Sequence, residues 1–171
     1  MPSTPEGSAS ASAAADHPAR TVAVADETSL GGFAHRLVAA LPRPAFVTLH
    51  GDLGAGKTTL VKAVAAALGI DPAGVVSPTF GLVHEHVTPV GLLLHADLYR
   101  LPGSDDLQEL GWHDAVARAA WVFVEWPERA GRVLPADRLD IAIEIHSPTS
   151  RTLRLIARGP RHAAAIGSLA G

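Results

Sequence analysis

The clearest chemistry in this sequence lies in the glycine-rich segment at residues 51–58. It reads Gly-Asp-Leu-Gly-Ala-Gly-Lys-Thr and matches the pattern G-x-x-x-x-G-K-[ST], in which glycines let the backbone turn tightly and aim its N–H groups at phosphate oxygens. Lys57 would bring a positive charge to the terminal phosphates, and the Thr58 hydroxyl can bind Mg²⁺. We therefore predict a nucleoside triphosphate site that is formed by Gly51, Asp52, Leu53, Gly54, Ala55, Gly56, Lys57, Thr58 and Thr59.

The segments on either side of the loop supply the structure that this motif needs. Residues 45–50 (AFVTLH) form a compact apolar stretch typical of a buried strand, and residues 57–68 are rich in Ala, Val and Leu, as expected of a helix that ends at Gly69. A helix that begins beside the loop points the positive end of its dipole at a bound phosphate. Strand, glycine loop and helix in this order support the nucleotide site and predict an α/β fold.

Two acidic residues are candidates for binding the metal and for catalysis. Asp97 follows the apolar residues 92–96, and Glu125 follows residues 121–124, so both are expected at the ends of buried strands. Strand ends are where α/β folds bind their ligands, and Mg²⁺ takes carboxylates together with phosphate and water. We predict that one acid holds the metal and the other orients the attacking water, and spacing alone does not decide between them. The predicted catalytic residues are Lys57, Asp97 and Glu125, and the predicted metal ligands are Thr58, Asp97 and Glu125.

Other interpretations of these polar residues stay open. Either acid could serve as a helix cap or in a surface ion pair, and Asp97 has Arg100 close by in the sequence. His95 shares a strand face with Asp97, as His84 does with His86, which allows a zinc site. We expect these histidines to be packing or surface residues, because a magnesium–triphosphate site has no need of them.

Composition narrows the range of functions further. The chain has no cysteine, which excludes disulfides, thiolate zinc sites and a cysteine nucleophile. It also has no asparagine, so the Asn-Lys-x-Asp motif by which GTPases recognise guanine is absent and ATP is the expected nucleotide. A net charge of −3 argues against sequence-independent binding of nucleic acid over a wide surface. No apolar run approaches the roughly 18 residues that span a bilayer. We expect a cytoplasmic protein without a signal peptide or a membrane segment.

The rest of the chain indicates one α/β domain between two terminal segments. Residues 1–20 are rich in Ala and Ser and are expected to be a disordered tail, residues 21–159 to form a P-loop ATPase domain, and residues 160–171 to form a C-terminal tail or short helix. We predict a P-loop NTPase-like, three-layer α/β domain with a central, largely parallel sheet. Besides the segments named above, we expect a helix from Asp26 to Leu41, a helix at 105–118 that bends near Gly111, and strands at 21–25, 80–87, 139–145 and 152–156.

Four segments together resemble the bacterial TsaE (YjeE) family: residues 51–59, Ser-Pro-Thr-Phe at 77–80, His-Ala-Asp-Leu-Tyr-Arg-Leu at 95–101 and Val-Glu-Trp-Pro at 124–127. The phosphate loop is common to many families, whereas its combination with the other three segments is specific, and the resemblance covers roughly residues 26–158. It implies a small, slow, Mg-dependent ATPase that is required for making threonylcarbamoyladenosine (t6A) at the tRNA adenosine next to the anticodon. It also implies that the protein acts with TsaD and TsaB and meets tRNA only through them.

The resemblance assigns roles to individual residues as well. It implies that Thr58 and Glu125 hold Mg²⁺, with Asp97 supporting the metal or the attacking water. This chain departs from the family at residues 105–106, which are Asp-Asp where Glu is commoner, and this change preserves the charge. The nucleotide-contacting residues that the resemblance adds are Thr79, in a switch-like loop at 77–79 near the γ-phosphate, Trp126 beside the nucleotide, and Arg151 from the link between the last two strands.

Two other functions stay open on sequence grounds. A small-molecule or nucleoside kinase would use the same loop, but it would need an acceptor pocket, and no segment rich in Arg and Lys stands out as a mobile lid. A nucleotide-gated binding module would differ from a slow ATPase only in rate. Because no arginine finger stands out near the loop, we expect slow hydrolysis by the isolated chain. Inorganic phosphate as the sole product beside ADP would separate the ATPase from the kinase.

Overall fold

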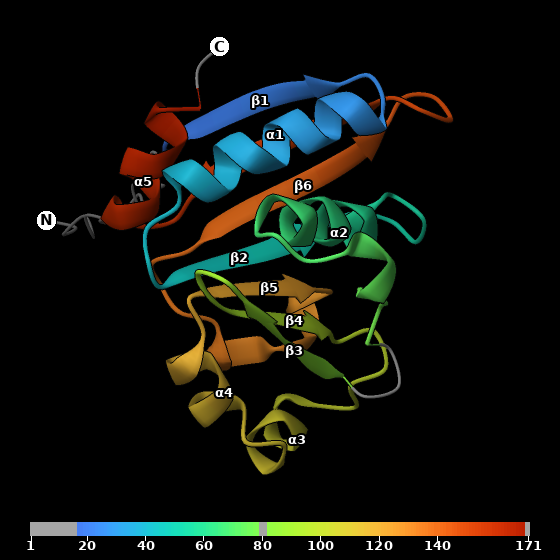
Figure 1. Ribbon diagram of the computed structural model, residues 1–171. Helices are drawn as coiled ribbons and strands as arrows, with labels where there is room; N and C mark the ends of the chain where they lie inside the picture. Colours follow the sequence, from blue (N-terminus) through green and yellow to red (C-terminus); the bar gives the residue numbers. More distant parts are fainter. Residues whose placement is uncertain (1–16, 79–81, 170–171) are drawn as a thin grey trace, which may run out of the picture.

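The computed structural model describes residues 17–78 and 82–169, which fold into a seven-stranded sheet with helices on both faces (Figure 1). The strands are β1 (Ala19–Val24), β2 (Ala45–His50), β3 (Val83–Thr88), β4 (Gly91–Asp97), β5 (Trp121–Glu125), β6 (Leu139–Ile145) and β7 (Arg151–Ala157). The α-helices of these ranges are α1 (Glu27–Ala40), α2 (Lys57–Ala67), α3 (Ser104–Glu109), α4 (Trp112–Arg118) and α5 (Pro160–Gly167). Short 3₁₀ helices occupy η1 (Pro72–Gly74), η2 (Pro127–Arg129) and η3 (Gly131–Val133).

The sheet combines a parallel centre with antiparallel flanks. Its strand order is β1-β7-β6-β2-β5-β4-β3, and the central strands β6, β2, β5 and β4 run parallel. On the flanks, β3 is followed directly by β4, and β6 by β7, through short links that can join only antiparallel neighbours. β1 pairs antiparallel with β7 and forms one edge of the sheet. The prediction of a central, largely parallel sheet is confirmed, with the parallel pairs confined to the centre.

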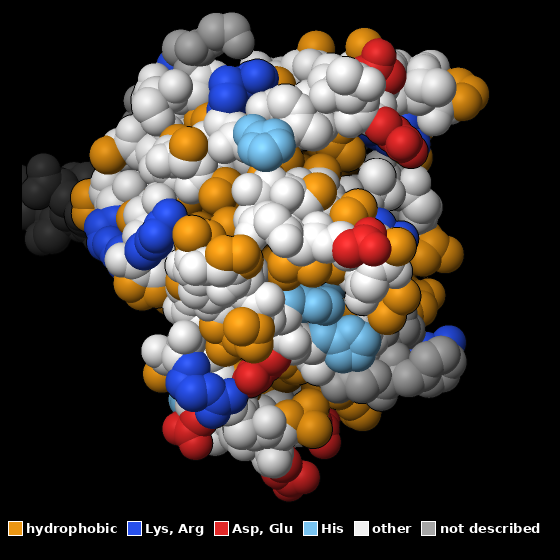
Figure 2. Space-filling view, in the orientation of Figure 1, with side chains coloured by type: hydrophobic (Ala, Val, Ile, Leu, Met, Phe, Trp, Pro, Cys, Tyr) orange, Lys and Arg blue, Asp and Glu red, His pale blue; other side chains and the backbone are white. Residues whose placement is uncertain are grey.

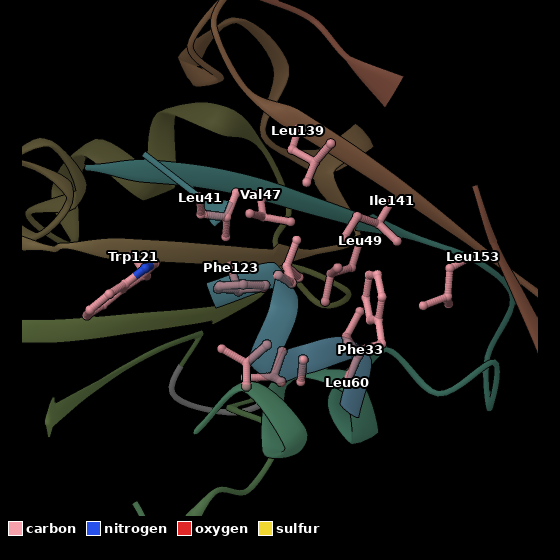
Figure 3. Packing of buried hydrophobic residues seen from close by; sticks show 14 of the residues in the cluster. Phe33, Leu41, Val47, Leu49, Leu60, Trp121, Phe123, Leu139, Ile141 and Leu153 are labelled. Carbon is pink, nitrogen blue, oxygen red and sulfur yellow. The ribbon is translucent and has the colours of Figure 1, made fainter. Parts of the chain in front are cut away.

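Helices cover both faces of the sheet and make three layers, as predicted. Along β2, Val47 and Leu49 face α1 and α2, where they share the larger core cluster with Phe33 and Leu60 (Figure 3). Phe46, on the opposite face of the same strand, belongs to a second cluster with residues of α3 and α4. Successive side chains of a strand point to opposite faces, so a strand that is covered on both faces is apolar at nearly every position.

Local signals set where the helices begin and end. α1 begins after Asp26, whose carboxylate accepts a hydrogen bond from the Ser29 N–H at 2.8 Å, while the Ser29 hydroxyl oxygen accepts one from the Asp26 N–H at 3.0 Å. The predicted bend at Gly111 is confirmed as a break between α3 and α4, where φ is 70°. Gly69 ends α2 with φ of 85°. Glycine adopts this left-handed backbone without the strain that a side chain would bring.

The first and last elements of the described chain lie together at the β1–β7 edge of the sheet (Figure 1). β1 begins at Ala19, so the last two residues of the expected N-terminal tail belong to the sheet, and residues 1–16 of that tail lie outside the described residues. α5 forms the short helix expected near the C-terminus. It is fixed to the sheet by His162, whose Nε2 accepts a hydrogen bond from the Phe46 N–H at 3.2 Å.

Charged groups are mixed on one face of the molecule. On the face drawn in Figure 2, Lys and Arg side chains are interspersed with Asp and Glu and with apolar side chains, and the described residues form no continuous basic surface there. This pattern agrees with the net charge of −3 and gives no support to a wide direct contact with nucleic acid. Of the helices in the described ranges, none is both long and apolar enough to cross a membrane.

Candidate functional site

Three strand ends meet at the carboxyl edge of the parallel centre. β2 runs into the glycine loop, β5 ends in Glu125, and β4 ends in Asp97. The register places Glu125 beside Leu49 of β2 on one side and beside Asp97 of β4 on the other. The predicted loop and both predicted acids therefore lie at one edge of the sheet, although 67 residues separate Thr58 from Glu125.

The loop between β2 and α2 has the backbone shape for which its glycines are needed. The φ angle is 150° at Gly51, 81° at Gly54 and 109° at Gly56, all in the range that side chains disfavour. A Cβ atom at Gly51 would also come within 2.9 Å of the Ile143 carbonyl oxygen, so only glycine fits there. α2 follows at once, and its first N–H groups are available to an anion bound in the loop.

Lys57 is folded over the loop and is only 5% exposed. Its Nζ donates hydrogen bonds to the carbonyl oxygens of Gly51 at 2.6 Å and Asp52 at 2.9 Å, and it lies 4.0 Å from the centre of the Trp126 ring. Burial lowers the pKa of Lys57, while the nearby charge of Glu125 acts to raise it. These contacts hold a cationic side chain at the loop, where phosphate oxygens would bind.

Glu125 is 3% exposed, and its Oε1 accepts two hydrogen bonds. One comes from Thr58 Oγ1 at 2.8 Å and the other from His95 Nε2 at 2.7 Å. A threonine hydroxyl beside a carboxylate offers the oxygen ligands that Mg²⁺ takes together with phosphate and water, so these residues fit the predicted metal. His95 is fully buried, as expected of a packing residue, and it also contacts Glu125 directly.

Asp97 lies next to Glu125 at the same sheet edge and is 4% exposed. Its Oδ1 accepts a hydrogen bond from the Tyr99 N–H at 3.0 Å, and its Oδ2 accepts one from the Ser77 hydroxyl. Asp97 therefore joins the first residue of the predicted switch-like loop to the site. Thr79, the residue of that loop predicted to contact the nucleotide, lies outside the described residues.

Trp126 follows Glu125 with a left-handed backbone, φ 57°, which a bulky residue keeps only where its surroundings hold it. Its ring lies 4.9 Å from the ring of Tyr99 and faces the Lys57 ammonium group. The aromatic pair thus forms one wall beside the loop. The placement of Trp126 near the nucleotide stays a prediction that this geometry allows.

Two of the pockets that open around the loop adjoin each other. The first has a volume of about 500 Å³, and its walls include Lys57, Asp97 and Glu125. The second has a volume of about 450 Å³ and is lined by residues of the loop, of the start of α1 and of the β6–β7 link. Gly56 and Thr59 line both pockets. A cation, hydroxyls and carboxylates in the first pocket suit phosphates and a metal.

The remaining predicted loop residues are divided between the pockets. Leu53 is 76% exposed and lines the first pocket together with Gly54. Ala55 is buried and lines the second. Asp52 contributes its backbone carbonyl to Lys57. The loop thus forms the boundary between the two pockets.

Sequence patterns did not reveal the second pocket. Asp26, Glu27 and Thr28 line it from the start of α1, and Pro148 and Thr149 line it from the β6–β7 link. These segments lie far from the loop in sequence and carry no motif of their own. Only the pairing of β1 with β7 and of β7 with β6 brings them to the loop.

Arg151 was predicted to reach the nucleotide, and it lines the second pocket. Its Nε donates a hydrogen bond to the Ala55 carbonyl oxygen at 2.9 Å, and its Nη1 donates one to the Ser147 carbonyl oxygen at 2.7 Å. The guanidinium group therefore ties the β6–β7 link to the glycine loop. A direct contact between Arg151 and the nucleotide stays a prediction.

Within residues 17–78 and 82–169, no group of three or more His, Cys, Asp or Glu side chains is arranged to hold a metal ion. The predicted magnesium site contains only two carboxylates and a hydroxyl, because Mg²⁺ takes its other ligands from phosphate and water. His84 and His86 pack edge to face with ring centres 6.2 Å apart.

Comparison with known proteins identifies the family. Residues 24–153 match the model of the family described as Threonylcarbamoyl adenosine biosynthesis protein TsaE. The chain is 43% identical over 110 residues to the tRNA threonylcarbamoyladenosine biosynthesis protein TsaE of Aquifex aeolicus (strain VF5), a match that covers 64% of this chain and 74% of the relative. It is 38% identical over 128 residues to the protein of the same name in Bacillus subtilis (strain 168), which covers 74% and 79% of the two chains.

A solved structure agrees with these relatives. The crystal structure of Bacillus subtilis YdiB matches with a TM-score of 0.70 and 29% sequence identity, over 90% of this chain and 95% of that one. The family match extends from the end of β1 into β7 and so includes the glycine loop, Asp97 and Glu125. The resemblance inferred from the sequence is confirmed, and this chain belongs to the TsaE family.

Proposed function

We propose that this chain is a slow, Mg²⁺-dependent ATPase that supports the threonylcarbamoylation of the tRNA adenosine next to the anticodon. The observation that carries the proposal is the hydrogen bond of 2.8 Å between Thr58 Oγ1 and Glu125 Oε1, beside a glycine loop that holds Lys57. Hydroxyl, carboxylate and lysine in this arrangement suit a magnesium–triphosphate. The pathway is supported by the family, whose members are named for the biosynthesis of this nucleoside.

The loop and four polar side chains of the first pocket have proposed roles. The loop N–H groups and Lys57 bind the β- and γ-phosphates, and Thr58 and Glu125 hold Mg²⁺, which when bound neutralises charge that develops on the phosphates. Asp97, beside Glu125 at the sheet edge, orients the attacking water or supports the metal. The second pocket takes the adenine and the ribose.

We further propose that the chain acts with TsaD and TsaB and meets tRNA only through them. The net charge of −3 and the mixed charges of Figure 2 do not favour a wide contact with tRNA. Arg151 is hydrogen-bonded to backbone carbonyls of Ala55 and Ser147, which supports slow hydrolysis by the isolated chain. Partners would then supply part of the stabilisation that an arginine finger gives other phosphate-loop enzymes.

The two lysines of the chain provide a matched test of nucleotide binding. Lys57→Ala removes the cation from the loop, whereas Lys62→Ala removes a lysine further along α2. Loss of a charged hydrogen-bonding group costs about 2–3 kcal/mol, so Lys57→Ala should weaken binding of the non-hydrolysable analogue AMP-PNP with Mg²⁺ by roughly 100-fold. Isothermal titration calorimetry should show Lys62→Ala at wild-type affinity. Equal affinity of both variants would place the nucleotide elsewhere.

Products and partners test the rest of the proposal. Turnover of ATP should release ADP and inorganic phosphate in equal amounts, and transfer of the phosphoryl group to a small molecule or nucleoside would support a kinase instead. Purified TsaD and TsaB should retain the chain in a pull-down, in a manner that depends on ATP. Failure to retain it both with and without ATP would refute the proposed partnership.

A further inference from the structure

His95 of β4 contacts the site but has no part in the function proposed above. It is fully buried, and its Nε2 lies 2.7 Å from Oε1 of Glu125. We propose that His95 is a positioning residue that fixes the Glu125 carboxylate in one orientation for the magnesium ion. The inference rests on the proposed binding of a magnesium–nucleotide and identifies a residue that prepares this site for the metal.

The direction of the hydrogen bonds supports this role. An ionised carboxylate that binds a metal only accepts hydrogen bonds, so in this arrangement the His95 Nε2–H group donates the hydrogen bond to Glu125 Oε1. Thr58 Oγ1 donates to the same oxygen at 2.8 Å. No described residue donates a hydrogen bond to Oε2, and Glu125 lines the first pocket. Two donors therefore fix one carboxylate oxygen, and the other keeps its capacity for a metal ion or a metal-bound water.

Both donors are held by regular secondary structure. His95 is paired with Phe123 of β5, two residues before Glu125, and Thr58 lies in the first turn of α2. A free glutamate side chain rotates about several bonds, and that freedom must be lost when it binds a metal. A glutamate that is already fixed by a neighbour loses less on binding, which is how outer contacts raise the metal affinity of a ligand.

The second ring nitrogen of His95 argues against a role in the core alone. Nδ1 is buried and has no hydrogen-bond partner among the described residues. A buried polar atom without a partner costs free energy that an apolar side chain would avoid. Leu93 and Phe123, which lie on the same face of the sheet, are apolar. The imidazole at this position is therefore better explained by its bond to Glu125 than by packing.

Substitutions of His95 that differ in one hydrogen-bond donor test the proposal. In His95→Gln, the side-chain amide can place an N–H group near the position of Nε2. In His95→Asn the amide lies near Nδ1 and is too short to reach Glu125, and His95→Leu has no donor. His86→Leu is the matched control, because His86 lies on the neighbouring strand β3 and on the same face, and it makes no described hydrogen bond to Glu125.

Calorimetric titration with AMP-PNP, in EDTA and at increasing Mg²⁺, gives a readout that does not depend on turnover. Mg²⁺ should raise the affinity for AMP-PNP, and in H95L and H95N the Mg²⁺ concentration that gives half of this increase should rise about tenfold. An effect of this size is typical when a hydrogen bond to a metal-binding side chain is lost. H95Q and H86L should stay within about twofold of wild type, as should the affinity of every variant in EDTA. Thermal denaturation tests whether each variant is folded. If H95L does not fold, the comparison is made between H95N and H95Q.

The outcomes separate this inference from the proposed function. An unchanged Mg²⁺ requirement in H95L and H95N, beside a wild type that binds the magnesium–nucleotide, would overturn the positioning role and leave the proposed function intact. A tenfold rise in H95Q would also overturn it, because a donor at this position would then be insufficient. A wild type without any Mg²⁺-dependent affinity for AMP-PNP would overturn the proposed function and the inference together.

Discussion

Two buried carboxylates flank the central strand β2, and their surroundings differ. Asp140 of β6 is 5% exposed and belongs to the face opposite that of its apolar neighbours Leu139 and Ile141. Its Oδ1 accepts hydrogen bonds from Thr48 Oγ1 at 2.7 Å and Arg138 Nε at 2.8 Å. Its Oδ2 accepts one from Arg158 Nε at 2.6 Å. Both oxygens of Asp140 are therefore occupied, and its charge is matched by arginines.

Glu125 of β5 is as deeply buried but is only partly satisfied. Its hydrogen bonds from Thr58 and His95 end on a single oxygen, and no Lys or Arg of the described residues forms an ion pair with it. Burial alone therefore does not distinguish Asp140 from Glu125, the acid proposed to bind the metal. The difference lies in whether the acceptor capacity of the carboxylate is used up within the protein.

The pKa of Asp140 agrees with a structural role. Burial acts to raise this pKa, but hydrogen bonds from Thr48 and Arg158 and the charge of Arg138 outweigh it, so the pKa lies below its usual value. The fold thus favours the ionised form of Asp140. If the comparison is right, substitutions at Asp140 should change stability and those at Glu125 should change metal binding.

The largest effect on stability is expected from Asp140→Ala, which leaves the Thr48 hydroxyl and two guanidinium groups without their acceptor. Breaking a buried ion pair costs about 3–5 kcal/mol, and the partial exposure of Arg138 and Arg158 reduces this to roughly 2–3 kcal/mol. Urea unfolding measures the loss. The folded variant should bind AMP-PNP as wild type does. Wild-type stability would show that this network does not hold the sheet together.

Lowering the pH should also weaken the stabilisation that Asp140 provides, by a smaller free energy than the Asp140→Ala substitution. Because the folded-state pKa of Asp140 is below the unfolded-state value, its contribution to stability is complete above that unfolded-state value, about 3.9, and is lost as the pH falls through the folded-state pKa. The unfolding free energy of wild type should therefore decrease more below about pH 4 than that of Asp140→Asn, by less than the loss expected for Asp140→Ala. Parallel pH profiles of the two proteins would contradict the assigned pKa direction.

Removing one of the two arginines should have a more modest effect. In Arg158→Ala, Asp140 keeps Thr48 and Arg138, and the Arg158 side chain is 35% exposed. We expect a loss of about 1 kcal/mol in urea unfolding. Arg132→Ala, at an exposed arginine, is the control and should not differ from wild type. A loss of unfolding free energy as large as that of Asp140→Ala would mean that Arg158 alone accounts for the stabilisation by Asp140.

The smallest change in stability is expected at Glu125, the acid proposed to bind the metal. Glu125→Gln keeps a carbonyl oxygen that can accept hydrogen bonds from Thr58 and His95, and it removes a buried negative charge. The unfolding free energy should change by less than about 1 kcal/mol in either direction. If urea unfolding instead shows a loss of stability comparable to that of Asp140→Ala, Glu125 stabilises the fold as Asp140 does, and the proposed difference between the two acids is wrong.

Local patterns in the sequence were sufficient for one half of the site. The glycines at 51, 54 and 56, with an apolar strand before them and a helix after them, specify the loop within a single segment. Asp97 and Glu125 could be placed at strand ends because each follows an apolar run, and the structure brings both to the loop. These features depend on neighbours in sequence, which is why they could be predicted.

The rest of the site depends on strand order, which no spacing encodes. His95 meets Glu125 only because β4 lies next to β5, and the second pocket forms only because β1 and β7 bring α1 and the β6–β7 link to the loop. Asp140 alternates with apolar residues as any exposed polar residue of a strand would. Its network becomes visible only when Arg138 and Arg158 are placed around it.

The central claim is that Glu125, and not Asp140, is the carboxylate that serves magnesium. The most direct test is calorimetric titration of AMP-PNP with and without Mg²⁺ into wild type, Glu125→Gln and Asp140→Asn, all confirmed as folded. We predict that wild type and Asp140→Asn gain the same factor in affinity from Mg²⁺, whereas Glu125→Gln loses most of that gain and keeps its affinity in EDTA. A full gain in Glu125→Gln, or its loss in Asp140→Asn, would contradict the account.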